Sequence, residues 1–79
     1  MKSKEIPEHN RKRLETIGNY LREYRFNEGL TQQEISENTH LHRNSIVRAE
    51  NGKNYTLLSL FELTDFYQIN TNELFSGID

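Results

Sequence analysis

Apolar residues recur at helical spacing along most of this chain. The first stripe consists of Leu14, Ile17, Leu21 and Tyr24. Intervals of three and four residues place these side chains on one face of an α-helix. Pro7 suits the first turn of that helix, where its missing N–H is no loss, and Gly29 suits the end, where a glycine can turn left-handed. We therefore predict an amphipathic helix from Pro7 to about Gly29.

The segment from Leu30 to Gly52 predicts two short helices joined by a tight turn. Thr31 can cap the first helix, and Glu34 completes a capping box of the T-x-x-E form. Residues 39–42 form the predicted turn, with Leu41 as its buried side chain. Two helices joined in this way are typical of the helix-turn-helix of DNA-binding proteins.

The second helix of this motif is predicted over residues 43–51 and has two different sides. Its inward side carries Ile46, Ala49 and Glu50, and its outward side carries Arg43, Asn44, Val47 and Arg48. We expect the motif to be held together by Ile35, Leu41, Ile46 and Ala49. Gly52 follows as a C-terminal glycine that can adopt a positive φ.

Two further helices are predicted towards the C-terminus. Thr56 can cap the first of them. Its apolar positions are Leu57, Leu60, Phe61, Leu63, Thr64 and Tyr67. Such a helix is too apolar for a solvated surface, so we expect it to be the central strut of the core. Asn70 or Thr71 can cap a fifth, short helix that presents Leu74 and Phe75.

Composition limits what this fold can be. The length of 79 residues allows one compact domain, which we place at residues 10–79, after a flexible basic arm over residues 1–9. The predicted class is all-α, a compact five-helix domain. The lack of cysteine excludes disulfides and thiolate metal sites. No apolar run reaches the roughly 18 residues of a membrane span, so we expect no membrane partner and a cytoplasmic location.

The formal charge of −2 is low for a nucleic-acid-binding protein, but it is unevenly distributed. All ten lysines and arginines lie at or before Lys53, together with eight acidic residues, whereas residues 54–79 hold four acids and no base. The N-terminal two thirds of the chain can therefore face phosphate, and the C-terminal third cannot.

The order and spacing of these features resemble the Cro/C1-type helix-turn-helix family, also called lambda-repressor-like or XRE, of small prokaryotic and phage DNA-binding regulators. The matching stretches between Ile17 and Phe75 are IGNYLREYR, GLTQQEI, RNSIVRAENG and INTNELF. Two positions depart from the family pattern, because Ser36 replaces the usual alanine and His40 the usual turn glycine. Serine fits if its hydroxyl bonds to the backbone, and a histidine at that glycine position would need a positive φ.

The outward side of the helix over residues 43–51 carries the side chains that can read bases. A helix in the major groove presents base contacts from its exposed N-terminal residues. Arginine can bind guanine O6 and N7, asparagine can bind adenine N6 and N7, and valine can touch a thymine methyl. This chemistry selects Arg43, Asn44, Val47 and Arg48, and the resemblance adds Ser45 as an occasional reader.

Phosphate contacts need other groups, because they fix register without reading sequence. Gln32 lies in the first turn of its helix, where free N–H groups and the helix dipole favour an anion. The resemblance implies that Gln32 also braces the reading helix. The expected phosphate contacts are Thr31, Gln32, Asn51 and Lys53, with nonspecific attraction from Arg11, Lys12 and Arg13 and from Lys2 and Lys4 of the arm.

Two further groups of polar residues have a structural interpretation. The resemblance implies a partly buried ion pair between Arg25 and Glu50, which fixes geometry more than it adds stability. His40 and His42 share the spacing of a metal-binding pair, but no third ligand is fixed nearby, so we interpret them as turn residues and expect no metal.

The sequence leaves two functions open. One is a sequence-specific transcriptional regulator of double-stranded DNA, a small homodimeric repressor on a palindromic operator. The other is an antitoxin-like or similar interaction module whose main partner is another protein. Both need an interface, for which we expect Tyr67, Leu74, Phe75 and Ile78, with core filling as the alternative for Leu74 and Phe75. No set of nucleophile, base and orienting acid is evident, so we expect neither an enzyme nor a cofactor.

Overall fold

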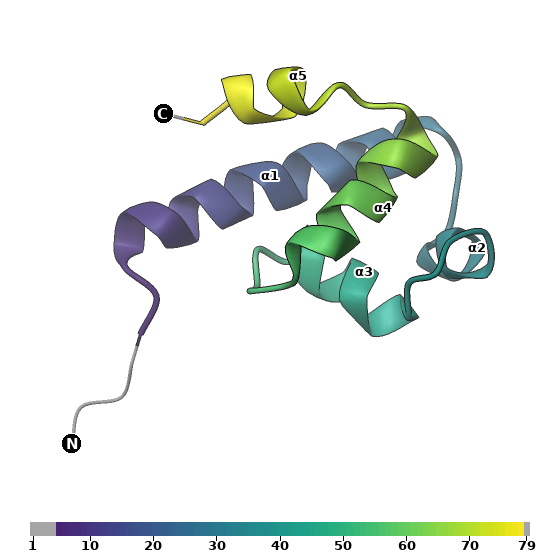
Figure 1. Ribbon diagram of the computed structural model, residues 1–79, viewed down its shortest axis with the longest axis horizontal. Helices are drawn as coiled ribbons and strands as arrows, with labels where there is room; N and C mark the ends of the chain where they lie inside the picture. The colour runs from purple at the N-terminus through teal and green to yellow at the C-terminus, as the bar shows by residue number, and fades with distance from the viewer. Residues whose placement is uncertain (1–4, 79) are drawn as a thin grey trace.

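The computed structural model describes residues 5–78, which form five helices and no strand (Figure 1). The helices are α1 (Glu8–Asn27), α2 (Gln32–Glu37), α3 (Arg43–Glu50), α4 (Leu57–Tyr67) and α5 (Thr71–Ser76). The predicted all-α fold of five helices is confirmed, with α2 and α3 as the helix-turn-helix.

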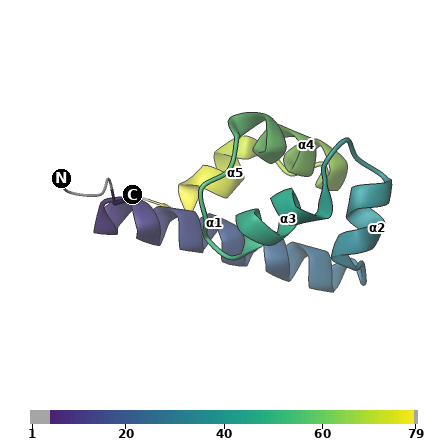
Figure 2. The ribbon, with the colours of Figure 1, turned by 90° about the horizontal axis from the view of Figure 1, so that it is seen from below.

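The long helix α1 crosses the whole domain, and the other helices are arranged around it. In Figure 1, α5 lies along one side of α1 and α3 lies on the other. Helices α1, α2 and α4 all pack against α3, which lies between them in Figure 2. Helix α1 already begins at Glu8, inside the range predicted as an arm. Lys2 and Lys4 lie outside the described residues.

The helix ends follow local capping chemistry. The Thr31 hydroxyl accepts a hydrogen bond from the Glu34 N–H at 3.1 Å, and the Glu34 carboxylate accepts one from the Thr31 N–H at 3.0 Å. This is the predicted capping box of α2. Gly29 and Gly52 have the expected positive φ, at +69° and +71°. Asn70, and not Thr71, caps α5.

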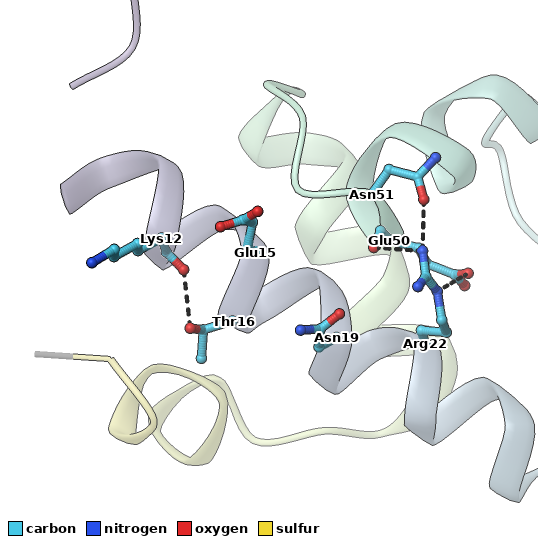
Figure 3. A pocket seen from close by; sticks show the side chains of 7 residues that line it. All are labelled: Lys12, Glu15, Thr16, Asn19, Arg22, Glu50 and Asn51. Atoms are coloured by element: carbon cyan, nitrogen blue, oxygen red, sulfur yellow. Dashed lines mark hydrogen bonds and ion pairs between the residues drawn. The ribbon is translucent and has the colours of Figure 1, made fainter. Parts of the chain in front are cut away.

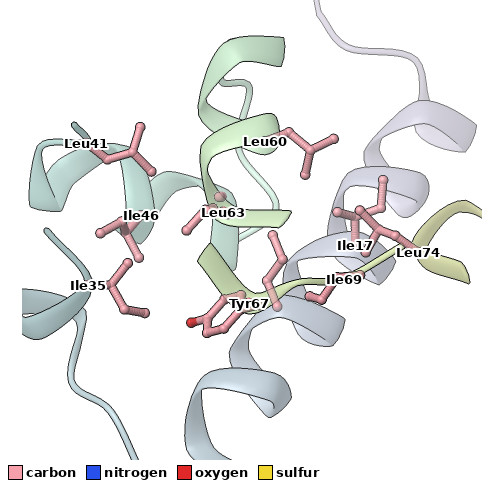
Figure 4. Close-up of a cluster of buried hydrophobic side chains, with 11 residues drawn as sticks. Ile17, Ile35, Leu41, Ile46, Leu60, Leu63, Tyr67, Ile69 and Leu74 are labelled. Carbon is pink, nitrogen blue, oxygen red and sulfur yellow. The ribbon is translucent and has the colours of Figure 1, made fainter. Parts of the chain in front are cut away.

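A single apolar core joins all five helices. The buried side chains are Ile17, Leu21, Ile35, Leu41, Ile46, Ala49, Leu60, Leu63, Tyr67, Ile69 and Leu74. Figure 4 shows them converging between α1, α3 and α4. All four residues expected to hold the helix-turn-helix together belong to this core. The position of α3 is therefore fixed by the same contacts that stabilise the fold.

Helix α4 is a core strut on one side only. Leu60, Leu63 and Tyr67 are buried, but Leu57 is 60% exposed and Phe61 is 45% exposed. The prediction that this helix is too apolar for a solvated surface was wrong at these two residues. An apolar helix is buried all round only where neighbours cover each side, and α3 and the core cover one side of α4.

The turn between α2 and α3 needs no left-handed residue. Among the described residues other than glycine, only Gln68, at the end of α4, has a positive φ. The expectation of a positive φ at His40 was therefore wrong. The Asn38 side chain donates to the Glu34 carbonyl at 2.7 Å and ends α2, so the chain turns without the usual glycine.

In the described part of the chain, no helix is both long enough and apolar enough to span a membrane.

Candidate nucleic-acid interface

Side-chain hydrogen bonds set the angle between α2 and α3. The Ser36 hydroxyl donates to the Leu41 carbonyl at 2.8 Å. The Thr39 hydroxyl donates to the Ile35 carbonyl at 2.8 Å and accepts from the Leu41 N–H at 3.2 Å. Ser36 therefore fits at the position of the usual alanine, because its hydroxyl bonds to the backbone as expected. The turn is a fixed unit with Leu41 buried beneath it.

The inward side of α3 ends in a buried carboxylate, Glu50. Arg25 of α1 donates to both of its oxygens, through Nε at 2.7 Å and Nη2 at 2.9 Å. The third guanidinium nitrogen of Arg25, Nη1, donates to the Leu30 carbonyl at 3.0 Å. The hydrogen bonds to Glu50 raise the pKa of Arg25 against the opposing effect of burial. The ion pair expected from the resemblance is present and is bidentate.

Gln32 joins the same cluster from α2. Its Nε2 donates to Glu50 Oε1 at 3.1 Å, so α1, α2 and α3 all meet at this carboxylate. Gln32 thereby braces α3, as the resemblance implies. Its contact with phosphate stays a prediction.

Arg22 of α1 also belongs to the cluster around Glu50, although it was not predicted from the sequence. Its Nη2 donates to the Glu50 carbonyl at 3.0 Å and to Asn51 Oδ1 at 2.6 Å. Figure 3 shows Arg22 reaching from α1 to both residues at the end of α3. The signal was its helical spacing, because Arg22 precedes Arg25 by three residues and so shares its face of α1.

Two glycines let backbones approach closely around this cluster. A methyl group at Gly18 of α1 would lie 2.5 Å from the Ala49 carbonyl oxygen and 2.9 Å from that of Glu50. At Gly52 it would lie 2.8 Å from the Glu15 side chain. Helix α3 therefore crosses α1 at a distance that only glycine permits.

The outward side of α3 presents the residues predicted to read bases. Arg43, Asn44 and Arg48 are exposed, and Ser45 and Val47 are half-buried. Among residues 5–78 no carboxylate pairs with Arg43. Arg48 is held differently, because its Nε donates to the Asn54 carbonyl at 2.9 Å. This bond directs Arg48 towards the loop between α3 and α4.

The residues predicted to bind phosphate lie near both ends of α3. Thr31 is exposed at the start of α2, and Gln32 is half-buried beside it. A shallow hollow at this end brings Thr31 and Gln32 together with Arg43. Asn51 and Lys53 are exposed just after α3. The predicted contacts therefore lie on either side of the outward face of α3.

Two of the four residues expected at a protein interface fill the core instead. Tyr67 is 5% exposed and Leu74 is 2% exposed, so neither can form a surface contact. This corrects the prediction for Tyr67, and for Leu74 it favours the alternative of core filling. Their burial follows from their positions on the inner sides of α4 and α5. Phe75 is exposed, and Ile78 is half-buried against the core.

The histidines of the turn do not gather with other metal ligands. His40 Nδ1 lies 3.2 Å from Glu62 Oε1. Within residues 5–78 there is no group of three or more histidine, cysteine or acidic side chains that could hold a metal ion.

Comparison with known proteins gives one match. A family model described as helix-turn-helix matches residues 21–74, which is well over half of the chain. No curated protein and no solved structure matches the chain. The matched range begins within α1 and includes the whole of α2, α3 and α4.

Proposed function

We infer the function from the family: this chain belongs to the Cro/C1-type helix-turn-helix family, and it is a DNA-binding helix-turn-helix regulator. Within that class, we propose that it recognises a specific sequence of double-stranded DNA as a small homodimeric repressor. In this proposal α3 lies in the major groove and the operator is palindromic.

One observation supports the proposal: the polar groups at the C-terminal end of α3 are held by hydrogen bonds, whereas those at its N-terminal end are exposed. Glu50 is held by three side chains from α1 and α2, whereas Arg43 and Asn44 at the other end are exposed. The first residues of a reading helix are those that reach base edges. Arg43 can bind guanine and Asn44 can bind adenine, each with two hydrogen bonds. Ser45 and Val47 line the same helix and add smaller contacts.

In this proposal Arg48 is a weaker candidate for reading bases than an exposed arginine on α3 would suggest. Its bond to the Asn54 carbonyl places the guanidinium beside the loop that follows α3. From there Arg48 can reach either a base or the phosphate next to Lys53. We rank it below Arg43 and Asn44 as a reader, because reading a base would require it to leave its present partner.

Phosphate contacts position the reading helix. Thr31 and Gln32 would bind one phosphate run through the start of α2, and Asn51 and Lys53 would bind the other run beyond α3. The Arg22 bond to Asn51 holds that side chain in place at 2.6 Å. Contacts on both sides of α3 would fix its register in the groove.

A second candidate function is favoured by a separate observation. The first turns of α4 expose Leu57 and Leu58, with 60% and 69% of their surface accessible. Large exposed apolar side chains in a cluster mark sites of protein contact. In this alternative the main partner is another protein, as for an antitoxin-like module, and DNA binding is secondary.

Selection of bound DNA from a random pool tests the proposal. We expect enrichment of one sequence arranged as two inverted half-sites, separated by about 34 Å or a multiple of that distance. The control is the double variant Arg43→Ala/Asn44→Ala, which should still bind DNA but should enrich no sequence. If the wild-type chain enriches nothing, specific recognition is wrong. If it enriches a single half-site without a repeat, the homodimer on a palindrome is wrong.

A further inference from the structure

Four large apolar side chains are exposed on one part of the surface, at the start of α4 and on α5. They are Leu57, Leu58 and Phe61 of α4 and Phe75 of α5, which lines one recess together with Leu57. We call these four residues the apolar patch. Leu58 is the most exposed of the four, at 69%. Burial of such side chains is favourable by about 1.5–3 kcal/mol each. Only 33% of the residues are hydrophobic, so four exposed ones are a large share of a small number.

A recess lies directly beside the patch. Its lining is almost entirely apolar and includes Leu14, Ile17, Tyr55, Leu57, Leu60 and Phe75. Three segments far apart in the sequence form it, namely α1, the start of α4, and α5. Leu58 follows Leu57 in the chain but is not among the residues that line the recess. The same surface therefore carries both an apolar projection and an apolar recess.

The charges around the patch favour pairing with itself. Residues 54–61, NYTLLSLF, contain no charged residue, although 28% of the whole chain is charged. Lys53 precedes this stretch and Glu62 follows it, so its two ends carry opposite charges. Two copies related by a two-fold axis run antiparallel, so the basic end of this stretch in one copy lies nearest the acidic end in the other. Lack of charge at the centre with charges at the rim is typical of a protein interface.

The patch also lies at a suitable place relative to the reading helix. Helix α3 ends at Glu50 and α4 begins at Leu57, so only a short loop separates them. Figure 2 shows this loop leading from the end of α3 to the start of α4. Dimerisation through the patch would bring two copies of α3 into one assembly, each joined to the interface by a short loop.

We propose that the apolar patch binds a second copy of this chain, with Leu58 of each copy entering the recess of the other. This inference deepens the proposed function, on which it rests, because it assigns the surface that makes the repressor a dimer. An interface with one surface used twice is isologous, so every contact in it is made twice. The patch replaces Tyr67 and Leu74, which are buried, as the centre of the interface.

Sedimentation equilibrium of the full chain without DNA tests this assignment. The wild-type chain should form a dimer within the micromolar range. Leu58→Glu should weaken the dimer by about 100-fold or more, since the lost apolar contact counts twice. Leu57→Glu, a second variant at the patch, should act in the same direction. The matched control is Ile6→Glu, because Ile6 is 43% exposed before the start of α1, and it should leave the dimer unchanged.

The outcomes separate failure of this inference from failure of the proposed function. Circular dichroism should show that the Leu58→Glu chain is folded, and a DNA half-site should still bind it. A dimer that is equally strong in wild type and Leu58→Glu would overturn the assignment while leaving the homodimer intact. A wild-type chain that stays monomeric with and without DNA would overturn both. Dimers that form normally without any DNA binding would instead overturn the proposed function alone.

Discussion

The inward and outward sides of α3 differ in how their polar groups are held. On the inward side, Glu50 accepts hydrogen bonds from Arg25 at 2.7 and 2.9 Å and from Gln32 at 3.1 Å. On the outward side, Arg43 and Asn44 are exposed, and no carboxylate among residues 5–78 pairs with Arg43. The contrast indicates a division of roles, in which one side places the helix and the other is available to a ligand. Variants on the two sides should therefore separate stability from recognition.

The largest effect is expected from breaking the buried ion pair. Glu50→Gln leaves the Arg25 guanidinium buried without its counter-charge, which should lower the free energy of unfolding by about 3–5 kcal/mol. Urea unfolding followed by circular dichroism measures this. Glu8→Gln is the control, because it removes a carboxylate from an exposed arginine pair and should change stability little. Equal effects of the two variants would contradict the special role of the buried side.

A slightly smaller loss is expected at the crossing of α1 and α3. Gly18→Ala should lower the free energy of unfolding by about 3 kcal/mol, since its methyl group would lie 2.5 Å from the Ala49 carbonyl oxygen. Gly29→Ala gives the comparison, because nothing lies within 4 Å of the added carbon. There only the left-handed backbone is strained, so the loss should be about 1 kcal/mol. If Gly29→Ala proves the more harmful, the close crossing does not position α3.

Tyr67→Phe should raise stability by about 1 kcal/mol. The Tyr67 hydroxyl is buried and has no hydrogen-bond partner among the described residues, so its removal relieves a desolvation cost. Burial also raises the pKa of Tyr67 above its ordinary value of 10.0. Because the pKa of Tyr67 is raised in the folded chain, its contribution to the free energy of unfolding is fully present below pH 10. That contribution is lost as the pH rises towards the folded-state pKa. The wild-type chain should therefore lose stability more steeply than Tyr67→Phe in alkali. Thermal unfolding at pH 7 and pH 11 distinguishes them.

The smallest effect is expected on DNA binding when Lys53, at the edge of the outward side of α3, is replaced. Lys53→Ala should weaken binding to all DNA sequences alike and should lower the slope of log affinity against log salt by about one unit. Fluorescence anisotropy over a range of salt concentrations measures the slope. Gln32→Ala should also weaken all sequences, but it removes no charge and should leave the slope nearly unchanged. If Lys53→Ala lowered the affinity for some DNA sequences more than for others, Lys53 would contact bases and not only phosphate.

The features that the sequence predicted best are those set by neighbours in the chain. The capping box of Thr31 and Glu34 depends on residues three apart, and the two sides of α3 depend on helical spacing alone. Both agree with the structure. The five helices follow from the same local signals, which explains why the fold was predictable from a single sequence.

The features that the sequence did not predict depend on contacts between distant segments. Arg22 meets Glu50 across 28 residues. Helical spacing places Arg22 on the same face of α1 as Arg25, but it does not show which distant residue Arg22 contacts. Exposure of Leu57 and Phe61 depends on what covers α4, which helical spacing cannot tell. The absence of a positive φ at His40 results from side-chain bonds of Asn38 and Thr39 that end α2 in another way.

The central claim is that α3 reads DNA through Arg43 and is held in place from its other side. The most direct test compares binding of the selected operator with binding of unrelated DNA for the wild type and for Arg43→Ala. The account predicts that Arg43→Ala loses about 1–3 kcal/mol of discrimination between the two, with urea stability unchanged within about 0.5 kcal/mol. Discrimination that stays at the wild-type value would contradict it.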